Sequence, residues 1–144
     1  MAVSEVNLFI SHSWTYSTHY DRLCEWIFDT TWRVDDVPIR FVNRSVPKDD
    51  PIHNAPTVDQ LRLQIYRRIA ASDVVVIPMG MYASYSKWIQ REIDGANLYK
   101  KPILAVDPWG QRRSSSVVRD AAANEVGWTS EGVVRGIWTL HTRR

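Results

Sequence analysis

The residues best suited to chemistry are Trp88 and Glu92, which stand four positions apart in the chain. On a helix, residues four apart lie on the same side, so an aromatic ring and a carboxylate would be neighbours there. Ile89, Ile93 and Ala96 would form the adjoining face that packs on a sheet, with the pair at its edge. Such a pair suits the wall and the charged group of a ligand site. It equally suits a core-edge tryptophan and a surface glutamate paired with an arginine.

Strand and helix signals alternate along the chain that must position this pair. Apolar runs predict strands at 6–10, 39–42, 73–78 and 102–106, and helical spacing predicts helices at about 16–32, 57–69, 85–99, 116–124 and 131–140. The run Asp73–Pro78 is apolar at nearly every position, so we expect it mid-sheet with both faces covered. This alternation predicts a three-layer α/β fold, with a parallel sheet of four to five strands and helices on both faces.

The expected sheet also predicts where a ligand would bind. In such sheets the ligand site lies at the carboxyl ends of the central strands, where the connections diverge. That rule selects the loops after Ile10, after Val42 and after Ile77. The predicted helix that carries Glu92 begins just beyond the last of these strands, so its carboxylate is expected at the mouth of the site.

Composition bounds the class of protein. The chain has 144 residues and a net charge of +2, which suits one domain spanning 1–144, and its basic pairs are too scattered to indicate nucleic acid as a partner. Cys24 is the only cysteine, so no internal disulfide can form. No apolar run reaches the ~18 residues of a membrane helix, and no signal peptide is visible. We therefore expect a cytoplasmic protein with no membrane partner.

Missing motifs exclude several kinds of site. The chain has no Gly-x-Gly-x-x-Gly and no Gly-Lys-Ser/Thr loop, and no Gly-x-Ser-x-Gly elbow. The first and third strands end in Ser11-His12 and Pro78-Met79, whereas a phosphoacceptor domain needs acidic residues there. The four histidines and the cysteine are not grouped at metal-ligand spacing, so we expect no metal.

Three segments in order resemble TIR domains. They are the strand end Phe9–Ser13, the strand Ser72–Ile77 and the pattern Ser86-x-Trp88-x-x-x-Glu92-Ile93. The likeness is greatest to the TIR-like subfamily of short bacterial proteins that includes the NAD-handling component of Thoeris antiphage systems. It covers nearly the whole chain, including the loop that begins Asn43-Arg44-Ser45, and is loose after Asp107.

The resemblance implies a flavodoxin-like, TIR-like fold and an enzyme that breaks down NAD. In catalytic TIR domains the glutamate of this helix is needed for NAD cleavage, and Glu92 occupies its place. NAD would be the substrate, and no cofactor is implied. Nicotinamide is already a cationic leaving group, so one carboxylate suffices to stabilise the oxocarbenium-like ribose that remains.

Other residues are expected to contact the substrate. Trp88 would stack on the nicotinamide or shield it from water. Ser11 and His12 follow the first strand and would face the ribose or a phosphate. Ser45 would belong to a lid formed by the loop at 43–56. Met79, with the glycine that follows it at position 80 (Gly80), would leave room beside the pocket floor.

The resemblance also implies partners. We expect self-association through TIR-like surfaces, and a cyclic ADP-ribose isomer that activates a separate effector protein during phage infection. Two alternatives stay open. One is a non-catalytic TIR-like adaptor, in which Glu92 forms a surface ion pair. The other is an enzyme like the nucleoside deoxyribosyltransferases, in which the glutamate is a nucleophile.

Overall fold

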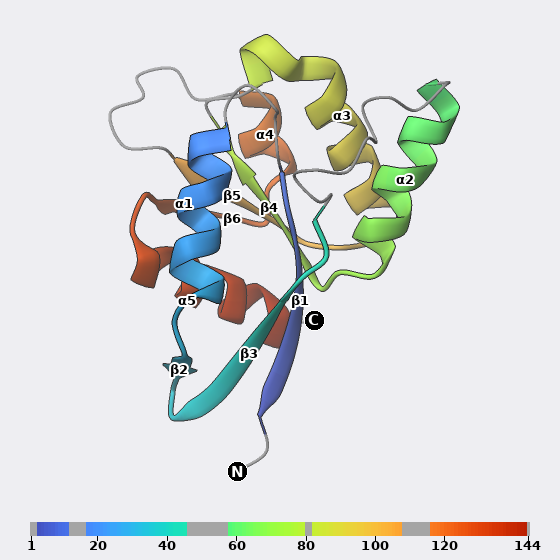
Figure 1. The fold of residues 1–144 in the computed structure, drawn as a ribbon. Helices are drawn as coiled ribbons and strands as arrows, with labels where there is room; N and C mark the ends of the chain where they lie inside the picture. Colours follow the sequence, from blue (N-terminus) through green and yellow to red (C-terminus); the bar gives the residue numbers. More distant parts are fainter. Residues whose placement is uncertain (1–2, 12–16, 46–57, 80–81, 108–115, 144) are drawn as a thin grey trace.

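Strands and helices alternate along the chain in the computed structural model, which describes residues 3–11, 17–45, 58–79, 82–107 and 116–143 (Figure 1). The elements in chain order are β1 (Ser4–Ile10), α1 (Ser17–Phe28), β2 (Trp32–Val34), β3 (Val37–Asn43), α2 (Val58–Ala70), β4 (Val74–Pro78), α3 (Tyr82–Leu98), β5 (Ile103–Asp107), α4 (Ser116–Ala121), β6 (Asn124–Gly127) and α5 (Ser130–Thr142). The expected helix and strand order is therefore present, with two strands added.

The strands form one sheet in the order β2-β3-β1-β4-β5-β6. All neighbouring pairs run parallel except β2 and β3, which are antiparallel. Without β2, this is the flavodoxin-like order, in which the chain steps outward from β1 to β3 and then crosses to β4 on the other side. The expected flavodoxin-like, three-layer fold class is confirmed. The direction of winding changes between β1 and β4.

Two apolar clusters cover the two faces of the sheet, because successive strand residues point to opposite sides. In β1, Leu8 and Ile10 lie in the cluster with α1 and α5, whereas Phe9 lies in the cluster with α2, α3 and α4. Figure 1 shows α1 on one side of the strands and α2 and α3 on the other. All residues of β4 are buried, which confirms the prediction of a central strand covered on both sides.

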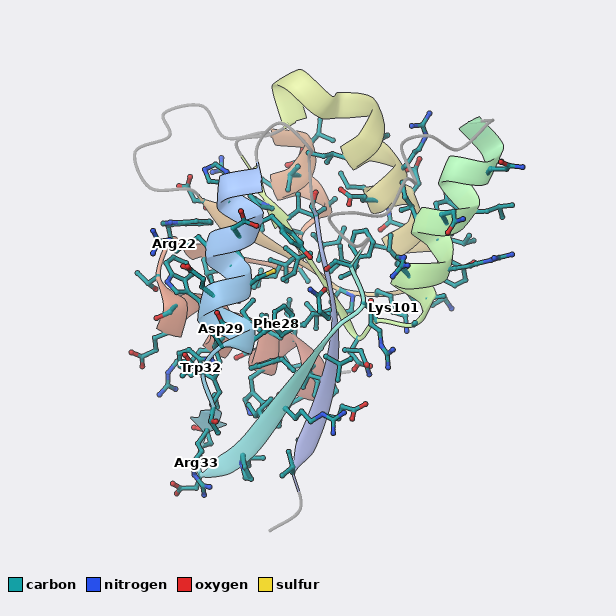
Figure 2. The ribbon with its side chains drawn as sticks, viewed as in Figure 1. Arg22, Phe28, Asp29, Trp32, Arg33 and Lys101 are labelled. Atoms are coloured by element: carbon teal, nitrogen blue, oxygen red, sulfur yellow. The ribbon has the colours of Figure 1, made fainter. Side chains whose placement is uncertain are left out.

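The prediction of a first helix extending to about Trp32 was wrong. Helix α1 ends at Phe28, and Trp32 opens the short strand β2 (Figure 2). Asp35 and Asp36 turn the chain back with φ of 52° and 66°. Positive φ at both central residues is the conformation of a tight hairpin turn, which aspartate tolerates better than most residues. The turn makes β2 an antiparallel edge strand and starts β3 earlier than predicted.

The sheet has six strands, not four to five, because β6 was also missed. The helix predicted at 116–124 stops at Ala121, and Asn124 begins β6. This strand is mostly exposed, and Val126 is its one half-buried apolar side chain. A short edge strand with one apolar residue has no alternating pattern, so pairing with β5 decides its conformation.

Candidate active site

Helix α3 carries Glu92 on its buried face. Ile89, Glu92, Ile93 and Ala96 follow the spacing of one helix stripe, and all four are buried, with Glu92 0% exposed. The expectation that Glu92 lies at the edge of this stripe was therefore wrong. Glu92 follows Ile89 by three positions and precedes Ala96 by four, which is the spacing of a core position. The surface ion pair of the adaptor alternative is excluded for the same reason.

Ser11 reaches Glu92 from the carboxyl end of β1. The alternation of β1 sends Phe9 toward α3, and Ser11 shares the side of Phe9. The Ser11 Oγ donates a hydrogen bond to the Glu92 Oε1 over 2.6 Å, between two side chains that are each 0% exposed. The Ser11 N–H donates to the Val76 carbonyl of β4 at 2.8 Å. The carboxylate therefore lies where the winding of the sheet changes direction, as expected for a ligand site.

The burial of this carboxylate has a thermodynamic cost. A carboxyl group removed from water destabilises the fold unless hydrogen bonds compensate it, and the Ser11 bond is one such compensation. A bond of 2.6 Å from a hydroxyl is in the range of charge-assisted hydrogen bonds. An apolar residue at position 92 would complete the stripe of α3 without that cost. The carboxylate is thus not explained by packing, which is the usual mark of a functional group.

Ser45 is buried, with 4% of its surface exposed, and its polar atoms contact three elements. Its Oγ accepts a hydrogen bond from the Ile10 N–H of β1 at 2.8 Å. Its own N–H donates to the Asn43 Oδ1 at 2.9 Å, and its carbonyl accepts from the Arg68 guanidinium of α2 at 3.1 Å. Ser45 therefore joins the ends of β1 and β3 to α2. The lid expected around it continues into residues outside the described part of the chain.

Asn43 and Tyr20 form a polar group on the α1 side of the same sheet edge. The Asn43 amide donates to the Tyr20 hydroxyl at 3.1 Å. Burial raises the pKa of Tyr20 above its ordinary value, and the hydrogen bond from Asn43 opposes that rise. The hydroxyl is thus a neutral group. Sequence reasoning missed both residues, although an asparagine at the end of a strand was a signal.

The other predicted site residues are only partly described. Met79 directly follows β4 and is 1% exposed, within the cluster that includes Ile89 and Ile93. The backbone of Trp88 belongs to α3, but its side chain lies outside the described part, as do His12 and Gly80 entirely. The structure therefore joins Ser11 to Glu92 directly. Contact of the remaining residues with a ligand stays a prediction.

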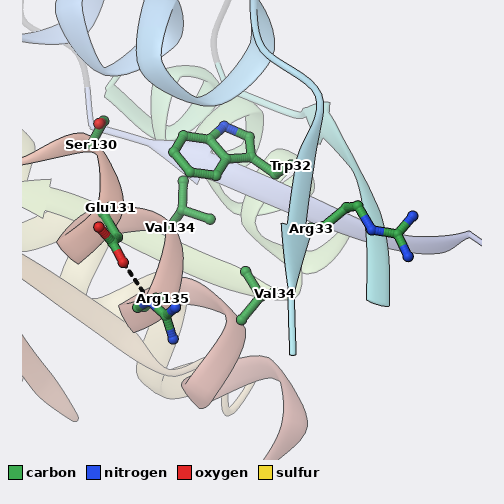
Figure 3. A pocket seen from close by; sticks show the side chains of 7 residues that line it. All are labelled: Trp32, Arg33, Val34, Ser130, Glu131, Val134 and Arg135. Atoms are coloured by element: carbon green, nitrogen blue, oxygen red, sulfur yellow. Dashed lines mark hydrogen bonds and ion pairs between the residues drawn. The ribbon is translucent and has the colours of Figure 1, made fainter. Parts of the chain in front are cut away.

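A surface hollow lies at another part of the sheet (Figure 3). It has a volume of about 210 Å³, and Trp32 and Val34 of β2 line it together with the start of α5. Figure 3 shows Arg33 directed away from it, and the Glu131 carboxylate bound to the Arg135 guanidinium at 3.0 Å. Its lining includes neither Ser11 nor Glu92, so we do not assign the chemistry to this hollow.

Within the described ranges, no three histidine, cysteine or acidic side chains are grouped so that they could hold a metal ion. None of the helices in that part of the chain has the length and apolar content of a membrane span.

A protein-family model matches most of the chain. The model of the TIR-like domain of the Thoeris protein ThsB matches residues 9–113, which is most of the chain and includes Ser11, Ser45 and Glu92. No curated protein matches.

Proposed function

Because the chain belongs to the family of ThsB TIR-like domains, with a TIR-like role in Thoeris antiphage defence, we propose that it cleaves the nicotinamide glycosidic bond of NAD. The observation that carries the proposal is the buried carboxylate of Glu92 at the carboxyl edge of β1 and β4. That edge is the ligand-binding edge of sheets with this winding. The family model includes α3, on which Glu92 lies.

The proposed chemistry needs one negative charge. As the bond between the ribose and nicotinamide breaks, nicotinamide takes the bonding electron pair and leaves neutral. The ribose then carries the positive charge of an oxocarbenium-like state. The Glu92 carboxylate stabilises that charge, and its effect is large because a buried site contains little water to weaken it. Water then adds to give ADP-ribose and a proton, or an atom of the same molecule closes a ring.

The burial of Glu92 adds a condition to this mechanism. Since the side chain is 0% exposed, a ribose reaches it only after the groups that cover it move. We infer that substrate binding opens the edge of the sheet above Ser11 and Glu92. A closed resting state would also protect cellular NAD from constant turnover.

The product is proposed to act as a signal. We propose a cyclic ADP-ribose isomer that a separate effector protein recognises, consistent with the Thoeris family of the chain. Self-association through TIR-like surfaces would complete the site between neighbouring copies.

The deciding experiment is incubation of the purified protein with NAD, followed by separation and mass analysis of the products. Nicotinamide together with ADP-ribose, or with a cyclic ADP-ribose that is one water lighter than ADP-ribose, supports the proposal. A covalent glycosyl intermediate trapped on Glu92 would favour the deoxyribosyltransferase alternative. Absence of nicotinamide even at high protein concentration would favour the adaptor.

A further inference from the structure

We propose that Ser11 and Ser45 are positioning residues that hold the Glu92 carboxylate in place, not residues that contact the substrate. This inference rests on the proposed NAD cleavage. It starts from the way in which the two hydroxyls are used. A serine hydroxyl has one hydrogen to donate, and the Ser11 hydroxyl donates it to the Glu92 Oε1. Donation to a ribose or phosphate would require this buried bond to break.

The peptide that carries Ser11 is held from both neighbouring strands. On the β3 side, the Ile10 N–H donates to the Ser45 Oγ at 2.8 Å. On the β4 side, the Ser11 N–H donates to the Val76 carbonyl at 2.8 Å. Both strand neighbours therefore fix the backbone directly before and at Ser11. Little freedom remains except rotation of the Ser11 side chain, and its bond to Glu92 restricts that rotation.

Ser45 is itself anchored on two sides. The Asn43 Oδ1 accepts from its N–H at 2.9 Å, and the Arg68 guanidinium donates to its carbonyl at 3.1 Å. A series of hydrogen bonds therefore connects α2 through Ser45 to the end of β1, and the end of β1 through Ser11 to α3. A carboxylate whose position is set in advance stabilises a developing charge without reorganising during the reaction. The geometry gives these two serines that function.

The test compares Ser11→Ala with the wild type in the purified full chain, with NAD as substrate. Loss of a group that acts only through Glu92 should lower kcat about tenfold to a hundredfold and leave KM within about twofold. Ser11→Thr keeps the hydroxyl and should recover most of kcat. Ser45→Ala should lower kcat by a smaller factor, because the backbone of β1 keeps its bond to β4.

A double variant separates positioning from substrate contact. In a Glu92→Gln background, Ser11→Ala should cause no further loss of turnover, because the charge that Ser11 positions is already absent. The control is Thr129→Ala. The Thr129 hydroxyl caps α5 by accepting from the Gly132 N–H at 3.0 Å, and α5 packs on the other face of the sheet from α3. That variant should lower the melting temperature and leave kcat unchanged.

Two results would overturn the positioning function. One is a Ser11→Ala variant with raised KM and normal kcat, which indicates substrate contact. The other is a Ser11→Ala change that lowers turnover by the same factor in the wild-type protein and in the Glu92→Gln variant. If the wild type does not release nicotinamide, the proposed function fails. Urea unfolding of the wild type, Ser11→Ala, Glu92→Leu and the double variant of these two then decides the positioning, because leucine removes the acceptor of the Ser11 bond. Non-additive effects on stability would support the Ser11–Glu92 bond, and additive effects would reject it.

Discussion

At the scale of single residues, Glu92 is an ionisable group buried among apolar side chains. It lies in the apolar stripe of α3 between Ile89 and Ile93, where an apolar side chain would be less costly to bury. A group retained at such a cost is a candidate for catalysis. Its chemistry can be tested by removing the charge while keeping the shape.

Replacement of Glu92 by glutamine should lower NAD turnover at least about a hundredfold, the scale of losing one preorganised electrostatic group. The amide oxygen can still accept the hydrogen bond from Ser11, and a neutral amide is less costly to bury than a carboxylate. We therefore expect the free energy of unfolding to change by no more than about 1–2 kcal/mol. Nicotinamide release and urea unfolding measure the two quantities.

The matched control is Asp94→Asn on the same helix. Asp94 is exposed, and its carboxylate accepts a hydrogen bond from the Gln90 amide at 2.9 Å, which asparagine can also accept. Turnover should stay near the wild-type rate. Wild-type turnover by Glu92→Gln would instead show that Glu92 is not the catalytic carboxylate.

At the scale of elements, the position of α3 depends on its close approach to α2. A Cβ at Gly95 would lie 2.9 Å from the Tyr66 ring and 3.0 Å from the Ile69 side chain. The two helices therefore pack closely one turn after Glu92. A shift of α3 away from α2 would also move the carboxylate relative to Ser11.

Gly95→Ala should therefore reduce both stability and turnover. Overpacking costs about 1–3 kcal/mol, and the higher helix propensity of alanine offsets up to about 1 kcal/mol of that cost. Gly127→Ala is the control, because a Cβ there meets nothing within 4 Å. Thermal unfolding and initial rates should show a loss for the first variant only. Equal melting temperatures for the two variants would contradict the packing argument.

Helix α1 contains a second testable group, His19. Its ring packs against Trp128, with centroids 5.2 Å apart, and burial lowers its pKa below the ordinary 6.5. The folded protein thus takes up this proton less readily than the unfolded chain. Its contribution to stability is complete above pH 6.5 and should be lost as the pH falls from there through the folded-state pKa.

The measurement compares the wild type with His19→Gln, which cannot take up the proton. The difference between their melting temperatures should be constant above pH 7. Below about pH 6.5 the melting temperature of the wild type should fall relative to that of His19→Gln. The change is small, because His19 is only partly buried. If the two plots of melting temperature against pH are parallel from pH 5 to pH 8, His19 does not contribute to the pH dependence of stability.

At the scale of the whole molecule, assembly is expected to control activity. A chain of 144 residues can scarcely enclose a dinucleotide, and Glu92 is wholly buried in the single chain. We therefore expect specific activity to rise with protein concentration as copies associate and complete the site. Initial rates over a wide concentration range, with sedimentation at the same concentrations, measure this. Substantial turnover that is independent of concentration would contradict it.

The sequence by itself determined the class of fold and the identity of the candidate carboxylate. The apolar run of β4 and the spacing of Ile89, Ile93 and Ala96 are strong local patterns, because each buried face repeats its apolar residues with the period of its element. The order of strands and helices then left few possible windings of the sheet. The resemblance of the segment around Glu92 supplied the proposed chemistry.

Only the tertiary structure decided what surrounds that carboxylate. Ser11 and Glu92 are 81 positions apart, and Ser45 is 35 positions from Ile10, so no local pattern reports their hydrogen bonds. The short strands β2 and β6 likewise depend on pairing with β3 and β5, since their own residues have weak preferences. Local periodicity shows which face of an element is buried, but the packing of distant elements decides which polar groups meet there.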